Sequence, residues 1–123
     1  MSKKKKDVWP TGRTTPETEF QMDIRVAGVS YHQEAVSFVR QGDDVLLEPE
    51  PLNAVDQNAI RVLVRNQHVG YIPAYATAPI HNWLQTKRIT SVQVNGVGRP
   101  EGSKYIGVGI SIDVAPIPER VEV

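Results

Sequence analysis

One stretch, residues 45–73, constrains the fold more than any other part of this chain. Its first apolar run is stopped by Pro49 and Pro51, which lack the backbone N–H that a strand ladder requires. A polar loop over 53–58 follows, where asparagine and aspartate side chains can hydrogen-bond the backbone of their own turn. Alternating apolar and polar residues then predict a β-hairpin over 59–72. A loop that directly precedes a hairpin can aim its polar groups at one fixed point.

The rest of the chain predicts further strands and two helices. Apolar residues at alternate positions predict three more strands, at 19–29, 89–97 and 105–114. Ser30 and Gln33 have the spacing of a capping box, which predicts a first helix that ends at Gly42. Helical spacing predicts a second helix over 74–87. Pro79 either kinks this helix or marks the first turn of its main part, with Thr77 as the cap. These elements add up to about six short strands with glycine bends and two helices. They predict a mainly β (α+β) fold in the form of a small, partly closed barrel.

The length of 123 residues suits one domain with a single modest core. Prolines, charges and the lack of any periodicity mark both ends of the chain. We therefore expect a disordered basic arm at 1–18, the folded barrel domain at 19–115 and a flexible tail at 116–123.

Composition limits the possible functions. The net charge is zero, and the four lysines at 3–6 supply much of the positive charge. Because non-specific affinity for duplex DNA comes largely from neutralised phosphates, this balance argues against extended duplex binding, whereas capture of a strand end needs few phosphate contacts. The absence of cysteine excludes disulfides and thiolate metal ligands. With no apolar run of membrane-spanning length and no secretory signal, we expect no membrane partner and a cytoplasmic location.

Catalytic patterns are missing from the sequence. There is no cysteine nucleophile, no Gly-x-Ser-x-Gly elbow and no phosphate-binding glycine loop. His32, His68 and His81 lack the spacing of a zinc site, and the pair Asp43 and Asp44 is interpreted as a solvated turn. The sequence therefore predicts a protein that is not an enzyme and has no cofactor or metal.

Two separated motifs carry a family resemblance. The chain resembles the HIRAN domain in two motifs, N-x-x-D-x-N-A-I over 53–60 and V-G-Y-I-P over 69–73. The resemblance extends upstream to V-A-G-V-S-Y-H-Q over 26–33 and covers roughly residues 20–112. That module is found alone in bacteria and phages, and at the N-terminus of fork-remodelling helicases and ubiquitin ligases. The resemblance implies an OB-like or SH3-like barrel with two helices, which agrees with the predicted elements.

A pocket for a single-strand end needs aromatic faces for the base, donors for phosphate and an acceptor for the terminal hydroxyl. Asp56 is the candidate acceptor, since a carboxylate can take a hydrogen bond from a 3′-hydroxyl and would repel a phosphate. The alternative, equally supported by the residues, is that Asp56 caps its own loop. Tyr31 is the candidate stacking ring and Tyr71 a pocket wall, with ordinary packing as the alternative for both. The resemblance implies the binding roles of Asp56 and Tyr31.

The other candidates are weaker phosphate or base contacts. His32 and Asn53 can donate hydrogen bonds, although loop asparagines commonly have a structural role. Helicase-linked members have an arginine at the position of Ser30 and a second aromatic at that of Val55, so affinity for DNA is expected to be reduced. Arg61 can compensate, or it can belong to a solvated charged face.

The sequence thus predicts a non-enzymatic DNA-binding module that recognises single-stranded DNA, at a 3′-hydroxyl end, in DNA repair or replication restart, with a helicase or nuclease as a possible partner. The alternative is a protein-interaction or accessory module that keeps the barrel without the DNA pocket. The predicted nucleic-acid-binding residues are Ser30, Tyr31, His32, Asn53, Val55, Asp56, Arg61 and Tyr71.

Overall fold

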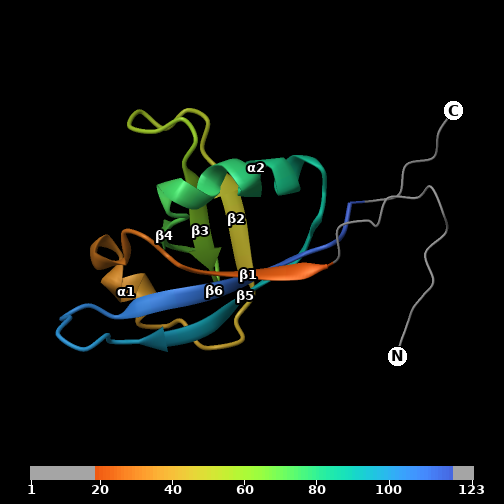
Figure 1. Ribbon diagram of the computed structural model, residues 1–123. Helices are drawn as coiled ribbons and strands as arrows, with labels where there is room; N and C mark the ends of the chain where they lie inside the picture. Colours follow the sequence, from red (N-terminus) through yellow and green to blue (C-terminus); the bar gives the residue numbers. More distant parts are fainter. Residues whose placement is uncertain (1–18, 118–123) are drawn as a thin grey trace, which may run out of the picture.

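The computed structural model describes residues 19–117, which form two three-stranded antiparallel sheets and two short α-helices (Figure 1). The predicted arm at 1–18 and residues 118–123 of the predicted tail lie outside the described residues. One sheet has the order β1 (Phe20–Arg25), β6 (Gly107–Val114) and β5 (Ile89–Gly98). The other has the order β2 (Val45–Pro49), β3 (Ile60–Val64) and β4 (Gln67–Tyr71). The predicted mainly β fold with six strands and two helices is confirmed.

The predicted alternation places one face of each sheet in a shared core. In β6, Val108, Ile110, Ile112 and Val114 are buried while the residues between them stay partly exposed. In β3 the burial alternates in the same way. Since successive side chains of a strand point to opposite faces, each sheet contributes its inner face to one core and shows its outer face to solvent.

The two sheets are joined by isolated bridges rather than by a continuous ladder, so the described strands do not close into a ring. One bridge pairs Ala27 with Tyr71, through two backbone hydrogen bonds of 2.8 Å, and the other pairs Asp44 with Gln93. The first bridge requires Gly70, because a Cβ there would lie 2.4 Å from the carbonyl oxygen of Ala27. This close approach gives the glycine of the V-G-Y-I-P motif its physical reason.

The first helix is much shorter than predicted. The chain forms a 3-10 turn at Val29–Tyr31 and one α-helical turn, α1, at Gln33–Val36. The predicted capping box is wrong, since neither cap uses a side chain, and the Gln33 amide instead bonds the carbonyls of Val29 and Ile106. The hydroxyl of Ser37 bonds the Glu34 carbonyl at 2.6 Å, a local bond that competes with continuation of the helix.

The second helix lies over the β2–β3–β4 sheet (Figure 1). It consists of a 3-10 turn at Ala74–Ala76 and α2 at Thr77–Gln85, so Pro79 falls in the first turn of the main helix, the second of the two alternatives, although the cap is Ala76 and not Thr77. Ile80 is fully buried, and Trp83 packs edge-on against Phe20 with ring centroids 5.3 Å apart. The helix therefore covers the core and leaves the loop between β2 and β3 free to project.

Candidate nucleic-acid interface

The loop between β2 and β3 is held by its own side chains. Asn53 Oδ1 accepts the backbone N–H groups of Val55 and Asp56, at 2.8 and 2.9 Å. Asp56 Oδ1 accepts the N–H of Asn58 at 2.8 Å, and His81 of α2 donates to the Asn58 carbonyl at 2.9 Å. The loop therefore has a defined shape although it projects from the body of the domain (Figure 1).

Only one of the two carboxylate oxygens of Asp56 accepts a hydrogen bond from the described residues. Its side chain is exposed, and the hydrogen bonds within the described residues engage Oδ1 alone. Asp56 lines a small cavity of about 320 Å³ together with Asn53, Val55, Ala59, Tyr71, Ile72 and Ala74. The loop-capping role and an acceptor role for Asp56 are thus compatible, because they use different oxygens.

Glu50 links two residues of this cavity, Asn53 and Tyr71, although it lines a neighbouring cavity itself. Its carboxylate accepts hydrogen bonds from Asn53 Nδ2 and from the Tyr71 hydroxyl, both at 3.0 Å. The bond from Asn53 is the main cause that lowers the pKa of Glu50 below its ordinary value, and Tyr71 and Arg61 act in the same direction. Burial, and then the bond to Glu50, raise the pKa of Tyr71. Glu50 is therefore a fixed negative charge that orients the loop and the tyrosine together.

Arg61 is engaged within the protein. Its guanidinium donates to Glu48, the cross-strand neighbour, and its Nε lies 3.4 Å from Glu50 Oε2 without hydrogen-bond geometry. The bond to Glu48 raises the pKa of Arg61. Two carboxylates thus compensate its charge, so a phosphate would have to compete with them.

A β-bulge places His68 and Tyr71 on the same face. Residues three apart in a regular strand point to opposite faces, but the register shifts so that Leu63 pairs with His68 and Val62 with Gly70, which leaves one extra residue in β4. The His68 and Tyr71 rings consequently meet edge-on, with centroids 4.8 Å apart. The centroid of the His32 ring lies 4.2 Å from that of the His68 ring. Burial, and then the charge of His32, lower the pKa of His68.

The Tyr31 corner lies next to this row of rings. Gly28 has φ +76°, a left-handed conformation that starts the 3-10 turn one residue after Ala27, which is bridged to Tyr71. Tyr31 is 87% exposed, so it does not pack the first helix on the core, while Ser30 is half-buried. Exposure of this ring leaves both faces accessible.

The structure divides the predicted site residues between two cavities. Asn53, Val55 and Asp56 share one with Tyr71, whereas Tyr31 and His32 line another. The bridge between Ala27 and Tyr71 joins the corner that carries Ser30, Tyr31 and His32 to the first cavity. Arg61 is directed to the acidic pair instead. Sequence reasoning missed Glu50 and His68, and the only signal for Glu50 was the acidic, proline-rich strand end before the loop.

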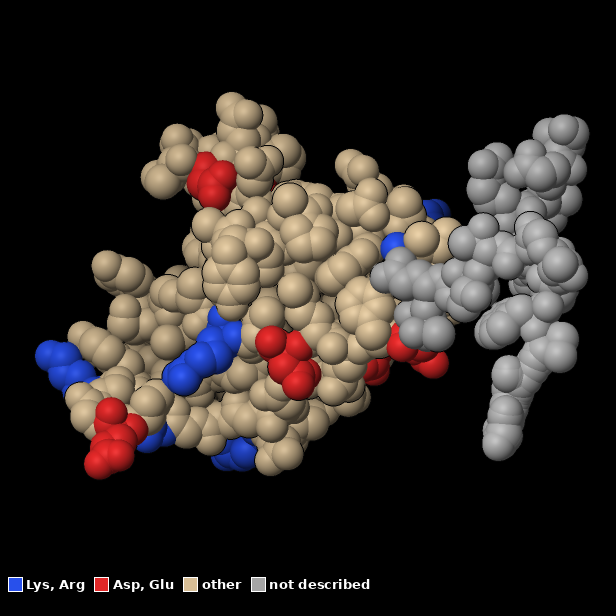
Figure 2. Space-filling model, viewed as in Figure 1, with Lys and Arg blue, Asp and Glu red and all other residues tan. Residues whose placement is uncertain are grey.

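Charge on the visible face is sparse. Figure 2 shows lysine and arginine side chains scattered singly among uncharged residues, without a continuous basic patch on the described part of that face. Within residues 19–117, no group of three or more His, Asp or Glu side chains is placed to hold a metal ion. Nor does that part of the chain contain a helix with the length and apolar character needed to cross a membrane.

Comparison with known proteins gives one family and two similar folds. Residues 20–115 match the HIRAN domain family. A crystal structure of a protein from Lactobacillus plantarum has a TM-score of 0.57 and 20% identity, over 78% of this chain and 98% of that one. The HIRAN domain of human HLTF has a TM-score of 0.56 and 18% identity, over 77% of this chain and 76% of that one. No curated protein sequence matches the chain.

Proposed function

The chain belongs to the HIRAN domain family, and from this premise we propose that it is a DNA-binding module that captures the 3′-hydroxyl end of a single strand. The observation that carries the proposal is Asp56, whose Oδ1 is consumed by its own loop while Oδ2 stays available beside a cavity walled by Tyr71. Three further properties of the protein remain predictions: a role in DNA repair or replication restart, a helicase or nuclease partner, and a cytoplasmic location.

The chemistry of Asp56 favours a hydroxyl end. A carboxylate oxygen accepts a hydrogen bond from a 3′-hydroxyl, and such charge-assisted bonds are about twice as strong as neutral ones. A terminal phosphate would bring negative charge against the same carboxylate. The site should therefore discriminate against a phosphorylated end rather than simply bind any strand.

Aromatic side chains can frame the terminal base. Tyr71 lines the cavity with Asp56, and the Ala27 bridge joins the corner that carries Tyr31 to Tyr71. The ring of Tyr31 is exposed, and base–aromatic stacking is worth about 1–3 kcal/mol per base. Val55 is 95% exposed where a second aromatic would complete a sandwich, so it can supply only apolar contact. With Arg61 already paired and Ser30 uncharged, contacts to the phosphate of the terminal nucleotide fall to His32, and we expect this nucleotide to add little to the salt dependence.

The experiment is fluorescence anisotropy with single-stranded oligonucleotides that differ only in a 3′-hydroxyl or a 3′-phosphate. The key variant is Asp56→Asn, because the amide keeps an oxygen for the Asn58 N–H and so preserves the loop, while the second carboxylate oxygen is lost. We expect the wild type to prefer the hydroxyl end by about tenfold, and Asp56→Asn to bind both ends alike. Glu101→Gln, an exposed residue outside this cavity, is the charge-matched control and should keep the preference. Equal affinity of the wild type for the two ends would overturn the proposal.

A second function is favoured by the exposed apolar side chains of the same loop. Leu52 and Val55 are each 95% exposed, as expected for a loop that contacts a protein partner. In that case the fold would serve as an accessory module without a DNA pocket. Unchanged DNA binding in Asp56→Asn and Tyr31→Ala, with an intact fold by circular dichroism, would favour this function.

A further inference from the structure

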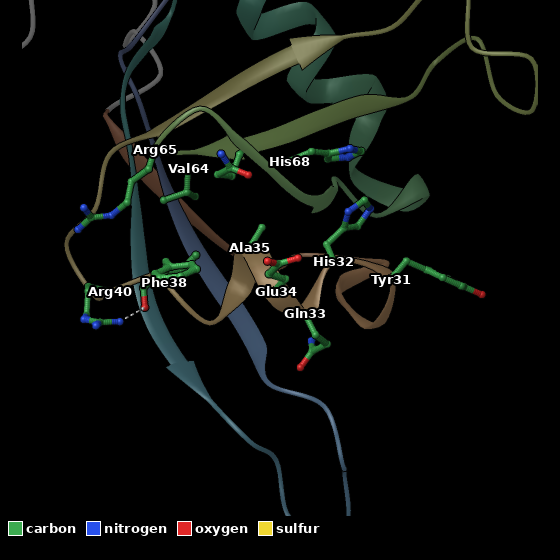
Figure 3. Close-up of a pocket in the computed structure, with 12 residues that line it drawn as sticks. Tyr31, His32, Gln33, Glu34, Ala35, Phe38, Arg40, Val64, Arg65 and His68 are labelled. Carbon is green, nitrogen blue, oxygen red and sulfur yellow. Dashed lines mark hydrogen bonds between the residues drawn. The ribbon is translucent and has the colours of Figure 1, made fainter.

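A second, larger cavity adjoins the proposed end-binding site. It has a volume of about 830 Å³ and lies between α1 and the β3–β4 hairpin. In Figure 3, Tyr31 and His32 lie at one end of it, and Phe38, Arg40 and Arg65 lie at the other. This volume falls within the range of pockets that enclose whole small-molecule ligands, so it is large enough for at least one nucleotide.

A row of three rings connects the linings of the two cavities. Tyr71 lines the cavity of Asp56, whereas His68 and His32 line the larger one. The three rings are in contact in the order Tyr71, His68, His32, at 4.8 and 4.2 Å. A strand whose last nucleotide sits at Asp56 can therefore continue across this row without leaving the protein surface.

The larger cavity contains groups that suit a nucleic-acid strand. Phe38 is 62% exposed, an aromatic ring that folding leaves in water at the far end from Tyr31. The guanidinium of Arg40 makes one hydrogen bond within the described residues, a long one of 3.4 Å to the Val39 carbonyl, and its charge also acts on Asp43. Arg65 is held by Asp43 through two bonds of 3.1 Å, but its side chain remains 58% exposed. These groups offer a stacking face next to donors for phosphate.

One lining residue opposes a phosphate. Glu34 is exposed in α1, between the two ends of the cavity. Its charge would repel a backbone that followed the α1 side, so phosphates are directed to the rim that carries Arg40 and Arg65. The bases then face the rings, which is the arrangement that sequence-independent single-strand binding uses.

We propose that this cavity holds the nucleotides that precede the 3′-terminal one, so that the ligand is a single strand of three or more nucleotides. Phe38 stacks on an upstream base, and Arg40 contacts the phosphate next to it. The inference rests on the proposed function, since the terminal nucleotide at Asp56 fixes the direction of the strand.

The test measures affinity against length, by competition of unlabelled 3′-hydroxyl oligonucleotides of two, four and eight nucleotides with a labelled strand. We expect the four-nucleotide strand to bind about tenfold more tightly than the dinucleotide, because one stacked base is added. Phe38→Ala should remove most of this gain and leave the dinucleotide unaffected. Leu46→Ala, which removes another exposed apolar side chain outside this cavity, is the matched control and should keep the gain. Arg40→Gln should reduce the slope of log affinity against log salt by about one for the longer strands only.

The two failures can be told apart. If the dinucleotide discriminates 3′-hydroxyl from 3′-phosphate but length adds nothing, or if Phe38→Ala behaves as the wild type, the inference is overturned and the proposed function stands. If no strand discriminates between the two ends, both are overturned. A gain with length that Phe38→Ala does not reduce, together with capture of an unstructured peptide by the same cavity, would assign the cavity to a protein partner and also overturn the inference.

Discussion

Gly70→Ala is the substitution that most directly tests how the site is assembled. A Cβ at this position would lie 2.4 Å from the Ala27 carbonyl oxygen and 2.6 Å from Val26 Cγ1. The first of these is a backbone atom that cannot rotate away, so the two sheets must separate by several tenths of an ångström. That movement stretches the two 2.8 Å hydrogen bonds between Ala27 and Tyr71. Overpacking costs about 1–3 kcal/mol, and each weakened hydrogen bond adds about 1 kcal/mol.

We therefore expect Gly70→Ala to lose about 3–5 kcal/mol of unfolding free energy, which is a fall in Tm of about 15–20 °C for a domain of this size. Urea unfolding and thermal melts followed by circular dichroism measure both. Gly96→Ala is the matched control, because a Cβ there meets nothing within 4 Å, and it should stay within about 0.5 kcal/mol of the wild type. A Gly70→Ala protein as stable as Gly96→Ala would refute the view that close approach at this bridge holds the sheets together.

Two further predictions concern Tyr71 and His68. Tyr71→Phe removes the hydroxyl that donates to Glu50, so we expect a loss of about 1 kcal/mol of stability and a rise in the pKa of Glu50. Carboxyl NMR titration measures this pKa, and an unchanged value would contradict the assigned bond. The pKa of His68 is lowered in the folded state by burial and by His32, so below its ordinary value of 6.5 the unfolded chain binds the proton more readily. The stability of the wild type should therefore fall as the pH drops below about 6.5. Between pH 7.5 and pH 5.5, His68→Gln should lose less unfolding free energy than the wild type, as measured by urea titrations. An identical loss in both proteins would count against this origin.

The strands were predictable because apolar and polar residues alternate along the sequence in the same way that buried and exposed side chains alternate along a strand. Val108, Ile110, Ile112 and Val114 alternate with glycines and polar residues, and the strand was predicted on that basis alone. The length of the first helix was not predictable in this way, because the capping-box spacing of Ser30 and Gln33 reports only on nearby residues. A contact 73 residues away overrides it, since Gln33 bonds both the N–H and the carbonyl of Ile106. Local patterns do not contain such partners.

The site was only partly predictable for a related reason. Asp56 and Asn53 were recognisable as loop formers, and the structure places both in their loop through bonds to nearby backbone. The contact between His68 and Tyr71 depends on a bulge, and a regular strand would have put the two rings on opposite faces. The pairing of Arg61 with Glu48 required the register of β2 against β3, which the sequence does not specify.

Tyr71 links the fold to the proposed activity, and this affects how the family motif should be interpreted. Its backbone makes the bridge to Ala27, its hydroxyl orients Glu50, and its ring begins the row that runs to His32. Gly70 and Tyr71 therefore have structural roles that do not depend on any ligand, so the V-G-Y-I-P motif supports the fold more strongly than it supports DNA binding. In the function that we propose, ligand choice depends instead on the side chains around this fixed centre, above all Asp56, whose second oxygen no described residue uses. Substitutions at Asp56 should change which strand end is bound while the domain stays folded, whereas changes at Gly70 should affect both properties together.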